Sequence, residues 1–480
     1  MPHPALSFGP LVPELILVGV GMVLLVVEAV VKRIDNGVLA VASIAAIVAA
    51  AIDDLTLWHW SGPSAVLGGM VSADRYAVVA RLIVLCVAVV GILFGLHYFE
   101  RIGEARGEFY PMVLLCTSGM TLIAAAGNLI VVFLALEILS LSLYVLTGMS
   151  FRLAAIEGAM KYFLLGAFSS AFFLYGIAMA YGATGTTSIS GIARALAQQG
   201  SSRALALTAA GLLAVGFGFK VAAVPFHMWA PDVYQGASTP ITAYMAAATK
   251  VAAFAALIRV FDVSFGSIVP DWTPFIWVLS AVTMVVGSVL AIAQTDVKRM
   301  LAYSSIAHAG FILTAVTAAT TGGVSAALFY LVAYAAMILG AFGVVMLVSI
   351  RGEDRTSLTS YAGLARRSPA LAGLLTLFLL SLAGLPPTAG FIAKVSVFAA
   401  AVRVGHWPLV LIAVLASVVA AFFYLRVIVL MYMQDPQETA EARAVPLPVL
   451  AMAAPAILTL VLGVFPGLLF GVLDSAARFR

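Results

Sequence analysis

The chain has 480 residues, of which 63% are hydrophobic and only 10% are charged, and its mean hydropathy is +1.13. No water-soluble domain has this composition, so we expect a membrane protein that crosses the bilayer many times. The net charge of +4 comes from basic residues scattered along the chain, which argues against a nucleic-acid partner. Cys86 and Cys116 both lie in apolar runs, without the spacing of a metal site or a disulfide framework.

Transmembrane helices account for most of the chain. A helix needs about 20 mainly apolar residues to cross the hydrocarbon core, and about 14 runs meet this requirement, joined by short connections. These runs lie near residues 11–31, 38–57, 75–98, 111–126, 129–149, 157–182, 204–229, 237–262, 273–293, 299–319, 324–349, 369–404, 408–432 and 446–471. We therefore expect an all-α polytopic protein with a single membrane domain over residues 1–480.

Three lysines lie well inside apolar runs. Lys220 lies in GLLAVGFGFKVAAVP, Lys250 in ITAYMAAATKVAAFAALIRV, and Lys394 in LAGLLTLFLLSLAGLPPTAGFIAKVSVFAAA. An ammonium group at the centre of a bilayer costs about 2.5–3.5 kcal/mol on insertion scales. Each lysine therefore needs water, an acidic partner or a neutral state, and these are the ingredients of a proton path.

Prolines lie close to two of these lysines. Pro225 follows Lys220, and the pair Pro386-Pro387 precedes Lys394. Because proline cannot donate to the carbonyl four residues earlier and crowds it, we expect helix interruptions near 221–225 and 382–388. Two interrupted helices in separate halves point to inverted repeats and an ion site near mid-membrane. The alternative is two ordinary proline kinks, with lysines that extend to the membrane surface.

Glu137 lies inside the apolar helix NLIVVFLALEILSLSLYVLTG, and Lys161 lies near the start of the next helix. A contact from Glu137 to Lys220 or Lys161 would favour the ammonium form, and loss of that contact would favour release of a proton. The alternative is a static ion pair that holds helices together.

His308 lies in RMLAYSSIAHAGFIL, and an imidazole relays protons near neutral pH. The alternative is a core histidine with satisfied hydrogen bonds. We expect His227 and Asp232 to cap half-helices and line a loop rather than bind a metal. The sequence contains no His/Cys metal cluster, phosphate-binding loop or nucleophile triad, so we expect neither a metal site nor a cofactor-binding site in this chain.

Four stretches together resemble the antiporter-like membrane subunits of respiratory complex I, and in particular the subunit N group of bacterial proton-pumping NADH:quinone oxidoreductases. The stretches are KYFLLGAFSSAFFLYGIAMAYGATGTT, FKVAAVPFHMWAPDVYQGASTPITAY, RMLAYSSIAHAGFIL and LAGLPPTAGFIAK. They span most of the chain from Glu137 to Lys394, and in combination they are specific. One departure is Ser238 in QGASTP, where the family pattern usually has proline. The conformation of the turn at this position could therefore differ from that of the family.

The resemblance implies an inverted-repeat antiporter-like fold of about 14 helices, two of them discontinuous. The implied divisions are N-terminal helices in 1–110, a first repeat in 111–262, a second repeat in 263–432 and a C-terminal helix in 433–480. The resemblance also implies a set of proton-transfer residues. Glu137 and Lys220 would form a coupled acid and base, and Lys161 would modulate them. Lys250 would be the central relay, His308 a link and Lys394 the exit residue.

The resemblance further implies proton translocation driven by redox chemistry in partner subunits, where NADH, FMN, iron–sulfur clusters and quinone are expected. The implied partners are other membrane subunits of complex I, especially related antiporter-like subunits, in the lipid bilayer of a bacterial inner membrane. Basic residues concentrate in alternate loops, which predicts that both termini are periplasmic.

Two other functions compete with this interpretation. One is a subunit of a multi-subunit cation/proton antiporter or a membrane-bound hydrogenase, which would share the same channel ancestry. The stretches DVYQGAS and KYFLLGAF favour complex I over that alternative. The other is a non-conducting structural scaffold, in which the lysines only hold helices together.

Overall fold

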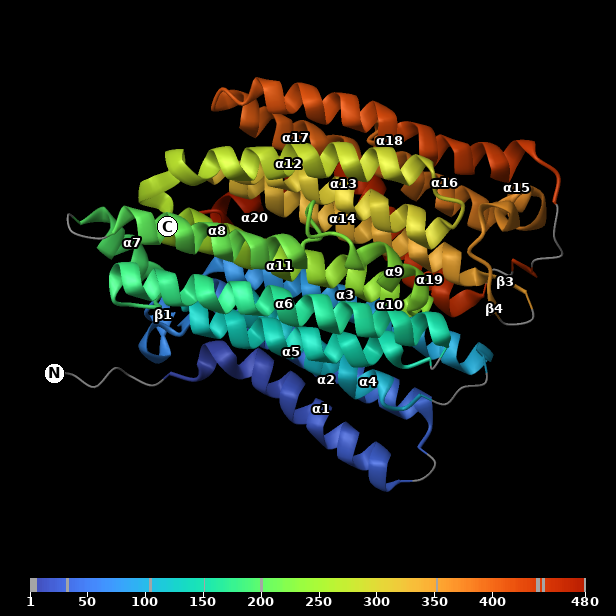
Figure 1. The fold of residues 1–480 in the computed structure, drawn as a ribbon. Coiled ribbons are helices and arrows are strands. Elements are labelled where there is room, and N and C mark those ends of the chain that lie inside the picture. The colour runs from blue at the N-terminus through green and yellow to red at the C-terminus, as the bar shows by residue number, and fades with distance from the viewer. Residues whose placement is uncertain are drawn as a thin grey trace.

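Helices dominate the computed structural model, which describes residues 7–31, 34–102, 106–150, 152–198, 202–350, 353–436, 441–442 and 445–478. The long helices lie side by side and run along the length of the molecule (Figure 1). Within the described residues, eleven helices are long and apolar enough to cross a membrane. The three remaining predicted runs correspond to α4, α13 and the interrupted pair α16–α17, so the predicted fold class is confirmed.

The helices of the first half are α1 (Val12–Val30), α2 (Asn36–Thr56), α3 (Arg75–Ile102), α4 (Phe109–Ala124), α5 (Leu129–Gly148), α6 (Leu153–Thr184), α7 (Ile189–Ala197), α8 (Arg203–Lys220), α9 (Trp229–Gly236), α10 (Thr239–Tyr244) and α11 (Lys250–Arg259). The helices of the second half are α12 (Val269–Ile292), α13 (Val297–Val316), α14 (Thr321–Leu347), α15 (Leu364–Arg367), α16 (Pro369–Ala383), α17 (Ala389–Arg403), α18 (Trp407–Met433), α19 (Pro446–Val464) and α20 (Gly467–Ala476).

Short strands occur only between helices in the described residues. β1 (Ala65–Val66) pairs antiparallel with β2 (Val71–Ser72). β3 (Val348–Ile350) pairs antiparallel with both β4 (Glu353–Asp354) and β5 (Glu441–Ala442). The strands are only two or three residues long, although Val66, Val71 and Val348 on them are buried.

The two predicted interruptions are confirmed. α8 ends at Lys220, and the chain then turns through Pro225 before α9 begins at Trp229. α16 ends at Ala383 with Gly384 in the left-handed region at φ 88°, and α17 begins at Ala389. Apart from the short helices α7 and α15, each predicted repeat segment is a series of five in which the interrupted helix is fourth: α4, α5, α6, α8–α9 and α10–α11, then α12, α13, α14, α16–α17 and α18. The repeat boundaries themselves stay a prediction.

The single run predicted at 446–471 is divided in the structure. α19 ends at Val464, and α20 begins at Gly467. Pro466 explains the division, because a residue before proline is pushed out of the helical region. Phe465 accordingly has φ −123° and ψ 59°.

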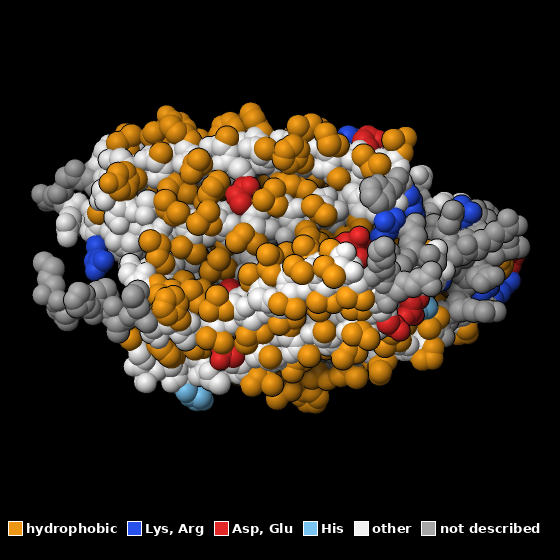
Figure 2. Space-filling model, turned by 90° about the horizontal axis from the view of Figure 1, so that it is seen from below, with side chains coloured by type: hydrophobic (Ala, Val, Ile, Leu, Met, Phe, Trp, Pro, Cys, Tyr) orange, Lys and Arg blue, Asp and Glu red, His pale blue; other side chains and the backbone are white. Residues whose placement is uncertain are grey.

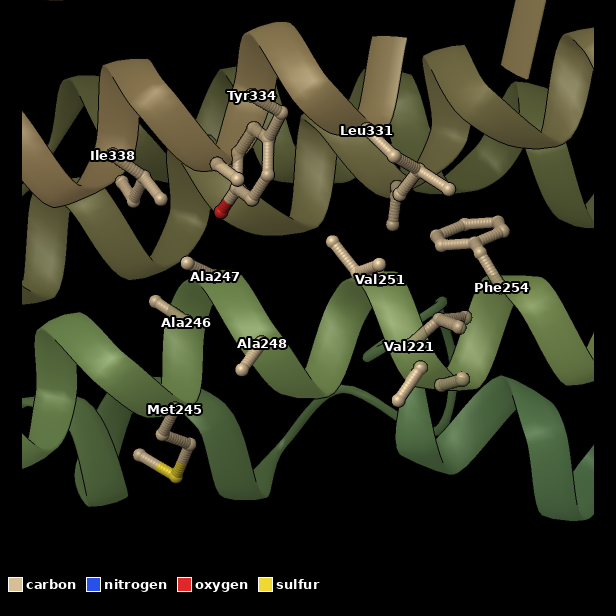
Figure 3. Close-up of a cluster of buried hydrophobic side chains, with 14 of the residues drawn as sticks. Val221, Met245, Ala246, Ala247, Ala248, Val251, Phe254, Leu331, Tyr334 and Ile338 are labelled. Atoms are coloured by element: carbon tan, nitrogen blue, oxygen red, sulfur yellow. The ribbon is translucent and has the colours of Figure 1, made fainter. Parts of the chain in front are cut away.

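Two helical segments form the centre of the bundle. Thr239–Ser264 is fully buried along its apolar window, and Thr321–Leu347 is nearly so. Thr239–Ser264 contains two π-helical turns, Met245–Thr249 and Val260–Ser264. Figure 3 shows α14 packed over this segment, with Tyr334 pointing toward the turn that carries Ala247. Polar side chains on these two segments therefore meet protein rather than lipid.

The outer surface suits a lipid bilayer. Hydrophobic side chains cover most of the face shown in Figure 2, and the Lys and Arg visible there lie toward its two ends. Exposed residues such as Leu164, Phe168 and Val418 lie in the middle of long helices. Such a contiguous apolar surface is far larger than that of a soluble monomer.

Close packing at the second interruption leads to a testable prediction about Gly390. A Cβ atom at this position would lie 1.8 Å from the carbonyl oxygen of Ser381, whereas a Cβ at Gly373 on α16 would meet nothing within 4 Å. We expect Gly390→Ala to destabilise the protein by about 1–3 kcal/mol through overpacking. Gly373→Ala, the matched control, should be neutral or stabilise it by up to about 1 kcal/mol. Thermal unfolding midpoints of the purified variants measure both, and equal midpoints would contradict the observed packing.

Candidate functional site

The three buried lysines share one kind of environment. Each ammonium nitrogen donates to a neutral oxygen and lies over an aromatic ring. None of the three forms an ion pair with a carboxylate among the described residues. A carboxylate partner would hold a lysine in its charged form, whereas neutral acceptors and a ring face leave both protonation states accessible.

Lys220 is the last residue of α8, where the first interruption begins. Its Nζ donates to Ser140 Oγ at 2.7 Å and to Tyr162 OH at 3.3 Å, and it lies 5.1 Å from the centre of the Tyr162 ring. Trp229, the first residue of α9, donates from Nε1 to the carbonyl of Phe219 at 2.9 Å. A side chain from beyond the break thus donates to a carbonyl in the last turn of α8, which also accepts from Ala222 N at 3.1 Å.

Glu137 does not contact Lys220 directly. Its Oε1 accepts a hydrogen bond from Ser170 Oγ at 2.5 Å, which ties α5 to α6. A small cavity of about 10 Å³ is lined by residues that include Ser140, Ser170 and Lys220. That volume is close to what a single water molecule needs. Ser170, the partner of Glu137, and Lys220 therefore line the same small cavity.

Lys161 differs from the other lysines in its exposure and in its partners. Its side chain is 43% exposed and pairs with Glu157 at 2.7 Å and with Asp232 at 2.8 Å. Asp232, in the first turn of α9, also binds Arg299 of α13 at 2.5 Å. Lys161 thus contacts the half-helix after the first break rather than Glu137. Exposed pairs of this kind contribute little stability.

Lys250 follows directly after a π-helical turn in the central segment. Its Nζ donates a short hydrogen bond to the backbone carbonyl of Ser305 on α13 and lies 5.2 Å from the centre of the Tyr334 ring. π-Helical turns often mark functional sites because they displace side chains from the regular helical register. The turn places Lys250 between α13 and α14.

His308 lies on α13 between two tyrosine hydroxyls. Its Nδ1 is 2.7 Å from Tyr330 OH, and its Nε2 is 3.3 Å from Tyr424 OH. Tyr424 OH also forms a short hydrogen bond with Ser304 Oγ. Because a hydroxyl can donate or accept, either ring nitrogen can carry the proton. The buried ring thus belongs to a chain of hydrogen bonds. Both of its nitrogens have partners, which is equally compatible with a structural role in the core.

Lys394 binds the second interruption. Its Nζ donates to the carbonyl of Ala383 at 2.8 Å and to Ser417 Oγ at 2.6 Å. Ala383 lies four residues before Pro387, which cannot donate to its carbonyl, so the break leaves that carbonyl open to Lys394. Nζ also lies 4.9 Å from the centre of the Phe311 ring, which is 5.7 Å from the His308 ring.

The structure brings Lys250, His308 and Lys394 together around one face of α13, over residues 304–311. Lys220 belongs to a second group on α5, α6 and α8. Aromatic rings extend from the Lys220 group toward α14, where Tyr234 packs against Phe342 at 6.3 Å. Tyr162 stacks on Trp229 at 4.3 Å, and Trp229 packs edge-on against Tyr234 at 6.3 Å.

Sequence reasoning did not identify the hydroxyl residues that serve these groups. Tyr330 and Tyr334 are four residues apart and share one face of α14, so their spacing could have predicted a polar face on this helix. Ser140 and Ser417 were hidden in apolar helices, where serine often binds only its own backbone. A lone serine or tyrosine in such a helix has no partner visible from the sequence.

Ser238, the departure from the expected proline, leaves the local turn intact. Its φ of −58° lies within the range that proline adopts, and its carbonyl accepts from Thr242 N at 3.0 Å. Lys298 Nζ donates to the neighbouring carbonyl of Ala237 at 2.5 Å. The turn at the start of α10 is therefore compatible with either residue.

A separate ion-pair cluster joins the three N-terminal helices. Arg81 on α3 is fully buried, and it lies 2.9 Å from Glu14 of α1 and 3.3 Å from Asp54 of α2. Arg259 on α11 likewise pairs with Asp74 at 2.6 Å. Unlike the lysines, these arginines are held by carboxylates, which favour a permanent charge. The described residues contain no group of three His, Cys, Asp or Glu suited to a metal ion.

Residues 126–420 match the family model described as "NADH:quinone oxidoreductase/Mrp antiporter, TM". The chain belongs to this family. The NADH-quinone oxidoreductase subunit N of Trichlorobacter lovleyi is 42% identical over 476 residues, which cover 98% of this chain and 97% of that protein. The protein of the same name from Rhodococcus opacus is 51% identical over 383 residues, covering 79% of this chain and 71% of that protein.

Solved structures of the family agree with the fold. A chain of "Respiratory complex I from Thermus thermophilus with bound Aureothin" has a TM-score of 0.82 and 36% identity, covering 97% of this chain and all of that one. A chain of the Mrp complex from Dietzia sp. has a TM-score of 0.84 at 20% identity, covering 98% of this chain and 97% of that one. The second likeness shows the fold alone.

The buried cluster around Arg81 generates a stability prediction. Replacing Arg81 with leucine would leave Glu14 and Asp54 buried without a counter-charge, so we expect a loss of about 3–5 kcal/mol. Arg203→Leu is the matched control. Arg203 is exposed, and its pair with Asp271 at 2.6 Å should contribute less than about 1 kcal/mol. Thermal unfolding midpoints test the pair of variants, and a wild-type midpoint for Arg81→Leu would contradict the assigned role.

Proposed function

We propose that this chain is a proton-translocating membrane subunit of respiratory NADH:quinone oxidoreductase, with protons passing through its buried Glu, Lys and His residues. The observation that carries the proposal is the shared environment of Lys220, Lys250 and Lys394, each bound to neutral oxygens rather than to a carboxylate. The names of the full-length relatives support the assignment to this complex.

In this proposal Glu137 and Lys220 form the loading pair. A proton would pass between Glu137 and Lys220 by way of Ser170 and the water-sized cavity that Ser170 and Lys220 both border. Lys161 would modulate the pair through Asp232, because that carboxylate fixes the half-helix after the break against α6 and α13.

Lys250 would be the central relay, His308 the link and Lys394 the exit residue. The hydroxyls of Tyr330 and Tyr424 give His308 a partner on each ring nitrogen. Thr249 Oγ1, beside Lys250, is buried without a hydrogen-bond partner among the described residues. Buried polar atoms of this kind are commonly satisfied by ordered water, which a proton path requires.

The redox chemistry is assigned to other subunits. We propose that this chain binds no cofactor and that NADH, FMN, iron–sulfur clusters and quinone belong to its partners. Its neighbours would be other membrane subunits, especially related antiporter-like ones, in a bacterial inner membrane. α1 begins and α20 ends at the same end of the helix array (Figure 1), which supports termini on one side, proposed to be periplasmic.

Replacement of Lys250 tests the relay. Lys250→Ala removes the proton carrier, and Lys250→Arg keeps a charge that cannot be released. We expect both variants to lower proton pumping, or the turnover coupled to it, by about 10²-fold, the low end for loss of an acid–base group. Electron transfer and pumping are measured separately in the assembled complex. Wild-type pumping and turnover in both variants would instead favour the structural scaffold.

Replacement of Glu137 tests the loading pair. Glu137→Gln keeps the size of the side chain and its contact with Ser170 but removes the charge. Ser170→Ala, the comparison variant, keeps the charge and removes one hydrogen bond, worth about 0.5–1.5 kcal/mol. We expect Glu137→Gln to depress pumping more than Ser170→Ala does, at equal subunit content of the complex. The reverse order would show that the carboxylate does not carry the proton.

A further inference from the structure

An apolar groove runs along the outer surface between α3 and the C-terminal helices. α3 contacts α14, α19 and α20, and the groove between them has a volume of about 450 Å³. Almost all of its lining is hydrophobic, with Cys86 as the one thiol. The proton-transfer proposal uses none of these residues.

The groove has the depth of one membrane leaflet. Its lining on α3 extends from Val79 to Val90, which corresponds to about 16 Å at the helical rise per residue. The hydrocarbon core of a bilayer is about 30 Å thick, so one leaflet occupies about half of that. A transmembrane helix of a partner would need a groove along the whole span, whereas an acyl chain needs only one leaflet.

A basic pocket lies at one end of the groove. It has a volume of about 360 Å³ and is lined by Asp74 and Arg75, where α3 begins, and by Ser475, Ala476 and Arg478, after the groove-lining part of α20. Arg75 lies 5.2 Å from the centre of the Trp58 ring. Tryptophan is enriched at membrane–water interfaces, where it anchors proteins.

The charge of this pocket is positive. Asp74 is already bound by Arg259 through two hydrogen bonds of 2.6 and 2.9 Å, and the nearby Asp474 accepts from Ser325 at 2.6 Å. Arg75 and Arg478 are exposed and form no ion pair within the described residues. Arg75 donates only through Nε, to the carbonyl of Trp58 at 3.4 Å. Two guanidinium groups without a carboxylate partner, at the surface end of an acyl-sized groove, fit a phosphodiester headgroup.

We propose that this groove and pocket bind one anionic glycerophospholipid. An acyl chain would lie between α3 and α20, over α14 and α19, and the phosphate would bind Arg75 and Arg478. The bound lipid would thus fill the space between α3 and the helix pair α19–α20. This site does not depend on the proposed proton path.

Photo-crosslinking in the assembled complex tests the site. The complex is reconstituted with phosphatidylglycerol that carries a diazirine in its acyl chain, or with phosphatidylcholine that carries the same chain, and crosslinked peptides are mapped by mass spectrometry. We expect phosphatidylglycerol to label the groove segments 79–90 and 454–473 more strongly than phosphatidylcholine does. Arg75→Gln and Arg478→Gln should each lower that labelling about fivefold, the factor for about 1 kcal/mol per basic residue.

Two further variants separate headgroup binding from groove filling. Arg194→Gln on α7 changes an exposed arginine that lines neither cavity, and it should leave labelling unchanged. Ala454→Trp fills the groove from the exposed side of α19 and should lower labelling by both lipids. Equal labelling by the two lipids, insensitive to Arg75 and Arg478, would overturn the proposal. So would groove peptides that crosslink to another subunit instead of to lipid, since a partner helix would then occupy the groove.

Discussion

The cost of polar groups in a bilayer governs this structure. In hydrocarbon, every backbone and side-chain polar group needs a partner within the protein. The two interrupted helices supply carbonyl acceptors, and they are met by side chains that would otherwise be stranded. Ala383 accepts from Lys394, and Phe219 accepts from Trp229. Each break in the backbone and each buried donor near it therefore stabilise one another.

Buried cations fall into two chemically different classes. Arg81 and Arg259 lie against carboxylates at helix ends, which suits a permanent charge and a structural role. Lys220, Lys250 and Lys394 lie against serine hydroxyls, backbone carbonyls and aromatic rings. A lysine in such surroundings can lose its proton without leaving a buried carboxylate unpaired. The arginines therefore hold the bundle together, whereas the lysines can carry protons.

The arrangement of helices explains why the polar residues meet. The central segment Thr239–Ser264 and α14 are enclosed by other helices, so their lysine and tyrosines face protein on all sides. α13 then serves as a common contact surface, where Ser305 binds Lys250, His308 binds two tyrosines and Phe311 faces Lys394. The first group, around Lys220, lies on other helices, and aromatic rings extend from it through Trp229 and Tyr234 to Phe342 of α14.

The sequence by itself determined the membrane-spanning helices, both interruptions and the three buried lysines. These follow from local properties, since apolar length and proline chemistry act within a single segment. Only the tertiary structure decided which groups meet: that Glu137 binds Ser170 rather than Lys220, that Lys161 binds Asp232, and that Arg81 joins three helices. Apolar helices present similar faces to every neighbour, so helix packing selects these partners from residues far apart in the chain.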